Sequence, residues 1–230
     1  MLVKHWIIDL KNQKLKNIYE SYLYRQERTL TFYLASVAVS NHASFPTEFH
    51  NHPVRASTNF DDNATSIRTV GEIHRMITDG RYDQLSRSFS IFALITSFGD
   101  FFDDIRKLLN LNTQEIKKPI KLLSETKPTL LVKTAPLKIA HHTNLKYGLN
   151  ARVADDYSTR WINCIINLRH MFVHDGGQFN PEYAEQMFST WCDLKTGDPI
   201  IFNQNQVDSI LWFLNDHVRD FTERLDAKTS

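Results

Sequence analysis

Residues 156–174 read DYSTRWINCIINLRHMFVH, and this stretch decides the fold class. It contains neither Pro nor Gly, and apolar residues occupy most of its circumference, which predicts a buried α-helix. Asp175 is followed by Gly176 and Gly177, and glycine readily adopts the left-handed conformation that ends a helix. We therefore expect a buried helix that runs to residue 174 and stops at the two glycines.

Five polar residues of this helix recur at intervals of three and four positions: Arg160, Asn163, Asn167, His170 and His174. At about 100° per residue, they form one polar stripe on a mostly apolar helix. Buried polar groups are costly without partners. The stripe is therefore expected to face water, a ligand, a polar network or another subunit.

Arg169 lies off this stripe, about 100° from His170 and close to the side of Ile165. An arginine on an apolar face needs a carboxylate partner or a side chain that reaches polar surroundings. The expected partners are acidic residues of an earlier predicted helix: Asp100, Asp103 and Asp104. The alternative is that Arg169 makes a structural ion pair and that the stripe is a polar network within the core.

Arg169, His170 and His174 together carry chemistry that suits a phosphodiester. His174 falls in the last helical turn, where the negative end of the helix dipole attracts positive charge. Imidazole exchanges protons near neutral pH, and the adjacent guanidinium is permanently charged. The group is therefore suited to proton transfer next to a phosphate.

The pattern of Arg169, His170, three further residues and His174 resembles the motif of the HEPN family, helical domains named for higher eukaryotes and prokaryotes nucleotide-binding. In that family an arginine, a polar residue, three residues and a histidine lie near the end of a long helix. The resemblance covers residues 86–225, while the first 80 residues match no family that we can name. The Pro-containing insert at 125–135 is unlike the smallest family members.

The resemblance implies a metal-independent endoribonuclease that acts as a homodimer, with the two motifs facing each other. The RNA 2′-OH attacks the adjacent phosphate, His174 serves as general base or acid, and Arg169 stabilises charge on the phosphorane. His170 positions the phosphate or shuttles a proton. An upstream acidic residue completes the site: Asp100, Asp103 or Asp104.

The resemblance also bears on biological role. Such domains often act as toxins or phage-defence effectors, so an antitoxin or regulatory protein is an expected partner besides RNA. Many relatives have lost activity. The alternative function is therefore a non-catalytic module for dimerisation, or for binding a nucleotide or a protein partner.

Composition limits the class of protein. The 42% hydrophobic and 12% aromatic content excludes disorder, and seven Gly and seven Pro are few for an all-β fold. The formal net charge of +1 gives no global basic field, so contact with RNA must depend on local charge. Cys164 and Cys192 lie in apolar surroundings without metal-ligand spacing. We expect a cytoplasmic protein with no signal segment, membrane span, metal or cofactor.

Hydrophobic periodicity predicts the remaining elements. In addition to 156–174, helices are expected over 15–40, 65–78, 82–110, 137–147, 181–191 and 203–225, with a short one opening at 112–113. A loop is expected over 41–63, and at 130–132 a strand with no recognisable partner. The prediction is an all-α bundle of about six to eight helices with long loops. Residues 1–80 are expected to form an N-terminal helical extension, and residues 81–230 a HEPN-like helical domain.

Overall fold

The computed structural model describes residues 6–55, 67–117, 119–122, 130–132, 134–180 and 194–230. Most of these residues are α-helical, and the strands are confined to two short antiparallel pairs. The expected all-α class is therefore confirmed. The helix expected over 181–191 lies outside the described residues. Among the helices that are described, none is both long enough and apolar enough to cross a membrane.

The chain divides into two compact units, one formed by residues 1–29 and 91–230 and the other by residues 30–90. The division falls within two long helices, α1 (Gln13–His42) and α3 (Arg81–Leu108). It therefore differs from the boundary expected near residue 80.

The difference arises because the first turns of α1 pack with the C-terminal helix of the larger unit. The Asp226 carboxylate accepts hydrogen bonds from the backbone N–H groups of Lys11 and Asn12, at 3.0 and 2.8 Å. Further along α1, the buried Tyr22 hydroxyl donates to Asn215 Oδ1 at 2.6 Å. These contacts join residues about 200 positions apart in sequence, which local periodicity cannot reveal.

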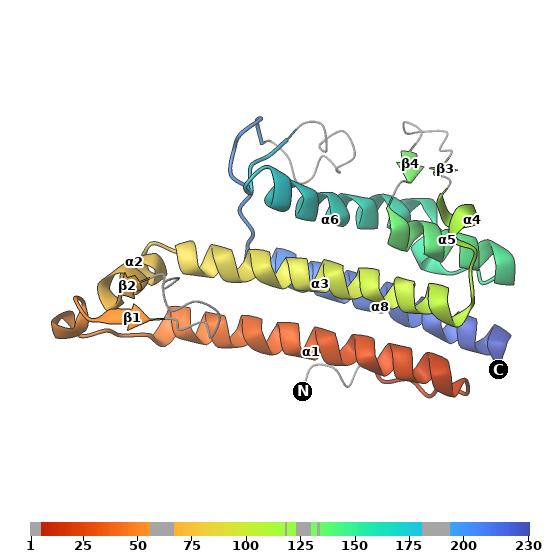
Figure 1. Ribbon diagram of the computed structural model, residues 1–230, viewed down its shortest axis with the longest axis horizontal. Helices are drawn as coiled ribbons and strands as arrows, with labels where there is room; N and C mark the ends of the chain where they lie inside the picture. Colours follow the sequence, from red (N-terminus) through yellow and green to blue (C-terminus); the bar gives the residue numbers. More distant parts are fainter. Residues whose placement is uncertain (1–5, 56–66, 118, 123–129, 133, 181–193) are drawn as a thin grey trace. The chain divides into compact units, whose positions relative to one another are not determined.

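The larger unit is built around aromatic side chains of α3. In Figure 1, α3 lies alongside α6 (Asp156–His174) and α8 (Gln204–Thr229). The Phe102 ring lies 5.1 Å from that of Phe221 on α8, and the Phe92 ring lies 5.2 Å from that of Phe172 on α6. Edge-to-face aromatic contacts of this kind stabilise a core beyond the area they bury.

Local sequence signals set the ends of several helices. At the start of α8, the Asn203 side chain accepts from the Gln206 N–H, and the Gln206 side chain accepts from the Asn203 N–H, both at 2.9 Å. This reciprocal pair satisfies two backbone donors that the first helical turn leaves open. α5 (Ala135–Tyr147) ends at Gly148 in the left-handed conformation, with φ of 58°. The helix therefore ends at residue 147, as expected from the sequence.

The smaller unit contains a strand pair that the sequence analysis did not predict. β1 (Pro53–Arg55) pairs antiparallel with β2 (Ile67–Thr69), so the expected loop over 41–63 contains a strand. A short 3-10 helix, η2 (Thr47–Phe49), precedes it. α2 (Val70–Thr78) begins later than the expected residue 65, because Thr69 forms a capping box with Glu72.

A second strand pair corrects the expectation that residues 130–132 have no partner. β4 (Leu130–Val132) pairs antiparallel with β3 (Ile120–Leu122). α4 (Thr113–Lys117) ends before Pro119, and proline is unfavourable inside a helix because it lacks an N–H. The chain is then free to form the strand that the sequence analysis missed.

Candidate functional site

The helix that carries the motif has the bounds expected from the sequence. The Asp155 side chain accepts a hydrogen bond from the Ser158 N–H at 2.7 Å and so caps the start of α6. At the other end, Gly176 and Gly177 adopt φ of 62° and 82°. A Cβ on Gly177 would lie 3.0 Å from the Phe172 ring, so this position needs glycine for space as well as for conformation.

The polar stripe on α6 reaches the surface only at its C-terminal end. Arg160, Asn163 and Asn167 have exposed fractions of 9%, 2% and 5%, so they lie within the chain. The Arg160 guanidinium lies 3.2 Å from the Asp156 carboxylate, one turn earlier on the same helix. The buried part of the stripe is therefore a structural feature, and among the described residues of the stripe the more accessible side chains are those of His170 and His174.

Arg169 is exposed, although it was expected on an apolar face. Val173, one turn further along, is also 59% exposed, so this side of α6 leaves the core beyond Ile165. The described residues supply neither a hydrogen bond nor an ion pair to the Arg169 guanidinium. Within one chain, the guanidinium is therefore available to an external anion.

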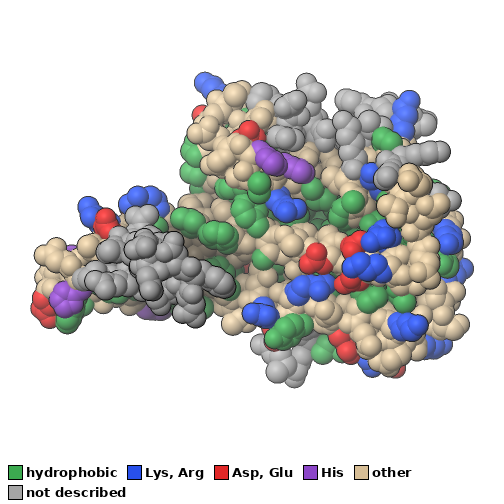
Figure 2. All heavy atoms as spheres, in the orientation of Figure 1, with side chains coloured by type: hydrophobic (Ala, Val, Ile, Leu, Met, Phe, Trp, Pro, Cys, Tyr) green, Lys and Arg blue, Asp and Glu red, His purple; other side chains and the backbone are tan. Residues whose placement is uncertain are grey.

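The two motif histidines lie against each other. Their ring centroids are 5.9 Å apart, and the ring planes are inclined by 15°. His174 is exposed and His170 is half-buried. Figure 2 shows histidine side chains gathered on the surface over this part of α6. Burial lowers the pKa of His170, and the positive charges of His174 and Arg169 lower it further. The lowered pKa favours the neutral form of His170, which can accept a proton.

The acidic residues of α3 are paired on their own helix. Asp103 contacts Arg106 and Lys107, each at 2.8 Å, and Asp104 contacts Lys107 at 3.2 Å. Asp100 is exposed and makes no ion pair with the described residues. Within a single chain, the expected pairing of one of these carboxylates with Arg169 is not formed. For Asp103 and Asp104, cations three or four residues along α3 are nearer partners.

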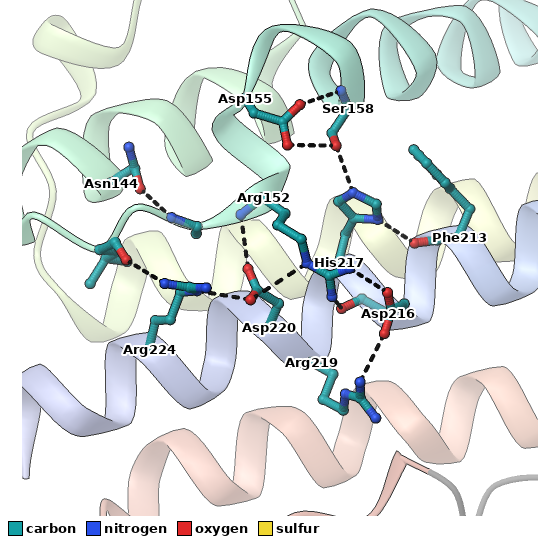
Figure 3. Close-up of polar contacts among 12 residues, drawn as sticks. Asn144, Arg152, Asp155, Ser158, Phe213, Asp216, His217, Arg219, Asp220 and Arg224 are labelled. Atoms are coloured by element: carbon teal, nitrogen blue, oxygen red, sulfur yellow. Dashed lines mark hydrogen bonds and ion pairs between the residues drawn. The ribbon is translucent and has the colours of Figure 1, made fainter.

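A polar network between α6 and α8 was not foreseen (Figure 3). His217 Nδ1 lies 2.6 Å from the Phe213 carbonyl oxygen, and Nε2 lies 2.8 Å from Ser158 Oγ. A carbonyl oxygen only accepts, so Nδ1 carries the hydrogen. Ser158 Oγ also lies 3.0 Å from Asp155 Oδ2, and its single hydrogen is donated to one of these two acceptors at a time. Burial lowers the pKa of His217.

This network is structural and is not a nucleophile site. A catalytic carboxylate orients the histidine, whereas Asp155 contacts the serine. Ser158 and His217 are also buried, with 4% and 5% exposed, so a substrate has no access to them. Nearby, Arg152 of the 3-10 helix η3 (Arg152–Ala154) pairs with Asp216 at 2.8 Å. The network therefore holds the start of α6 against α8.

Comparison of the chain with family models, with curated proteins and with solved structures found no match. The case for a function therefore depends on the residues at the end of α6.

Proposed function

We propose that this chain is a metal-independent endoribonuclease of the HEPN type that acts as a homodimer. The observation that carries the proposal is the group at the end of α6: an exposed Arg169 beside the stacked imidazoles of His170 and His174. A guanidinium binds phosphate with strong, directional hydrogen bonds. Two imidazoles supply the base and the acid that cleavage of RNA requires.

In the proposed reaction, neutral His170 accepts the proton of the RNA 2′-OH as the 2′-oxygen forms a bond to phosphorus. The bond between phosphorus and the 5′-oxygen breaks, and protonated His174 supplies a proton to that oxygen. Arg169 stabilises the charge that develops on the phosphorane oxygens. The products carry a 2′,3′-cyclic phosphate and a 5′-hydroxyl, and no metal ion takes part.

The division of roles follows from the environments of the rings. His170 is half-buried beside two positive groups, and its lowered pKa favours the neutral form. His174 is exposed in the last turn of α6, so it is the ring that a leaving group can reach. A second copy of the chain would bring an equivalent group to the same substrate. A toxin or defence role, with an inhibitory partner protein, accords with this activity.

The test is cleavage of a mixed RNA pool in EDTA by the wild-type chain and by Arg169→Ala and His174→Ala. Both positions are exposed, so the variants should keep the fold and the light-scattering mass of a dimer. Matched controls are Arg28→Ala and His42→Ala, which change exposed residues of α1. We expect cleavage by the wild type and the controls only. Equal cleavage by all five proteins would place the activity elsewhere, and a folded dimer without cleavage would favour a binding module.

A further inference from the structure

A cavity of about 360 Å³ lies between α6 and the first turns of α8, outside the group described above. Its volume is in the range of pockets that bind small molecules, about 300–1,000 Å³. The lining combines three aromatic residues with polar residues of α8: Tyr157, Trp161, Phe213, Asn205, Gln206 and Ser209. All of them belong to the larger unit.

The aromatic wall suits a flat ring. The Trp161 ring neighbours those of Tyr157 and Phe213, with centroids 6.4 and 6.3 Å away. Nucleobases stack on aromatic side chains when proteins bind unpaired RNA. The residues that line the cavity carry no formal charge. This lining therefore favours a neutral planar group over a phosphate.

The polar wall is rich in donors. The Gln206 side-chain oxygen accepts the Asn203 N–H, and the Asn203 side-chain oxygen accepts the Gln206 N–H. The capping box uses the amide oxygens, so the two amide nitrogens keep their hydrogens for a ligand. Asn205 and Ser209 are exposed and add two further polar groups. Guanine presents adjacent acceptors, O6 and N7, on one edge.

We infer that this cavity binds a nucleobase, with guanine preferred, and so selects the sequence at which RNA is cut. Ile165 lines the cavity, and on an ideal helix Arg169 lies about 6 Å further along α6 and about 40° around it. A strand whose base fills the cavity therefore passes its phosphates to Arg169. The link to RNA rests on the proposed function, whereas binding of the base does not.

The experiment is calorimetric titration of the full-length chain with guanosine, adenosine, uridine and cytidine, which carry no phosphate. Guanosine should bind most tightly. Asn205→Ala should weaken its binding tenfold or more, since a donor is lost. Ser209→Tyr should abolish binding by filling the cavity from an exposed position. Gln204→Ala, an exposed amide outside the cavity, is the control and should bind within twofold of the wild type.

Two outcomes would overturn the inference: none of the four nucleosides binds, or Ser209→Tyr binds guanosine as tightly as the wild type. Tighter binding of another nucleoside would overturn the guanine preference. His174→Ala separates this inference from the proposed function, because it should lose cleavage and keep guanosine binding. If cleavage depends on His174 but guanosine does not bind, the inference about the cavity is wrong and the proposed nuclease stands. Guanosine binding without cleavage refutes the nuclease alone.

Discussion

The imidazole rings of His170 and His174 stack one helical turn apart, with 5.9 Å between their centroids. Because the rings are close, a positive charge on one disfavours a positive charge on the other. The half-buried His170 is the ring that loses its proton more readily, as its lowered pKa shows. His170 is therefore the ring of the pair that favours the neutral form.

The coupling between the rings predicts how His170 titrates. His174→Asn removes one neighbouring charge and Arg169→Gln removes another, so each change should raise the pKa of His170. NMR titration of the histidine ring signals measures this directly. His42→Asn, on an exposed residue of α1, should leave the His170 titration unchanged. A midpoint for His170 that stays the same or falls in both motif variants would show that the rings do not interact as described.

Buried histidines predict a loss of stability in mild acid. Burial lowers the pKa of His217 below its usual 6.5, while Asp216 and Asp155 oppose this and Arg152 adds to it. The unfolded chain therefore binds more protons than the folded chain as the pH falls through 6.5. The free energy of unfolding should fall from pH 7.5 to pH 5 in urea titrations. His217→Gln should flatten this dependence, although it also costs stability at pH 7.5. An unchanged slope in that variant would contradict the account of His217.

The two glycines after α6 should differ in their tolerance of alanine. Both adopt positive φ, and a left-handed non-glycine residue costs roughly 1–2 kcal/mol. A Cβ at Gly176 meets nothing within 4 Å, whereas at Gly177 it lies 3.0 Å from the Phe172 ring. We expect Gly177→Ala to reduce the free energy of unfolding more than Gly176→Ala in urea denaturation. Equal losses would mean that the Phe172 ring moves aside without cost.

The aromatic core predicts a large contrast between two phenylalanines of α3. Phe102 is fully buried against Phe221, and Phe102→Ala should cost about 3–5 kcal/mol of unfolding free energy because it leaves a cavity. Phe89, on the same helix, is 55% exposed, so Phe89→Ala should change stability by about 0.5 kcal/mol or less. Denaturant titration of both variants measures the difference. A small loss for Phe102→Ala would contradict the packing described here.

Local signals in the sequence were sufficient for the main helices. α6 was predicted with its observed bounds, because a stretch without Pro or Gly and the two glycines after it are local signals. The strand pairs were missed, because each of the four strands has three residues, too few for the alternating pattern that indicates a strand. The division within α1 depends on long-range contacts, such as the one between Asp226 and Asn12.

The candidate site was predicted in part. The residue spacing on α6 placed Arg169, His170 and His174 at one helix end, as observed. The exposure of Arg169 depends on tertiary packing. The pairing of Asp103 depends on which of the nearby cations reaches it first. The aromatic cavity joins residues of α6 and α8 that lie about 50 positions apart. No periodicity within either helix indicates such a pocket.

The most direct test of the proposed nuclease compares two RNA oligomers. One is an all-ribose oligomer that the wild type cuts, and the other is the same oligomer with a single 2′-deoxy nucleotide on the 5′ side of the cut. Cleavage in EDTA is followed by identification of the product ends. The account predicts a 2′,3′-cyclic phosphate from the all-ribose oligomer, no cut at the deoxy position, and no product with His174→Ala. Cleavage at the deoxy position, or products that carry a 5′-phosphate, would contradict attack by the 2′-OH.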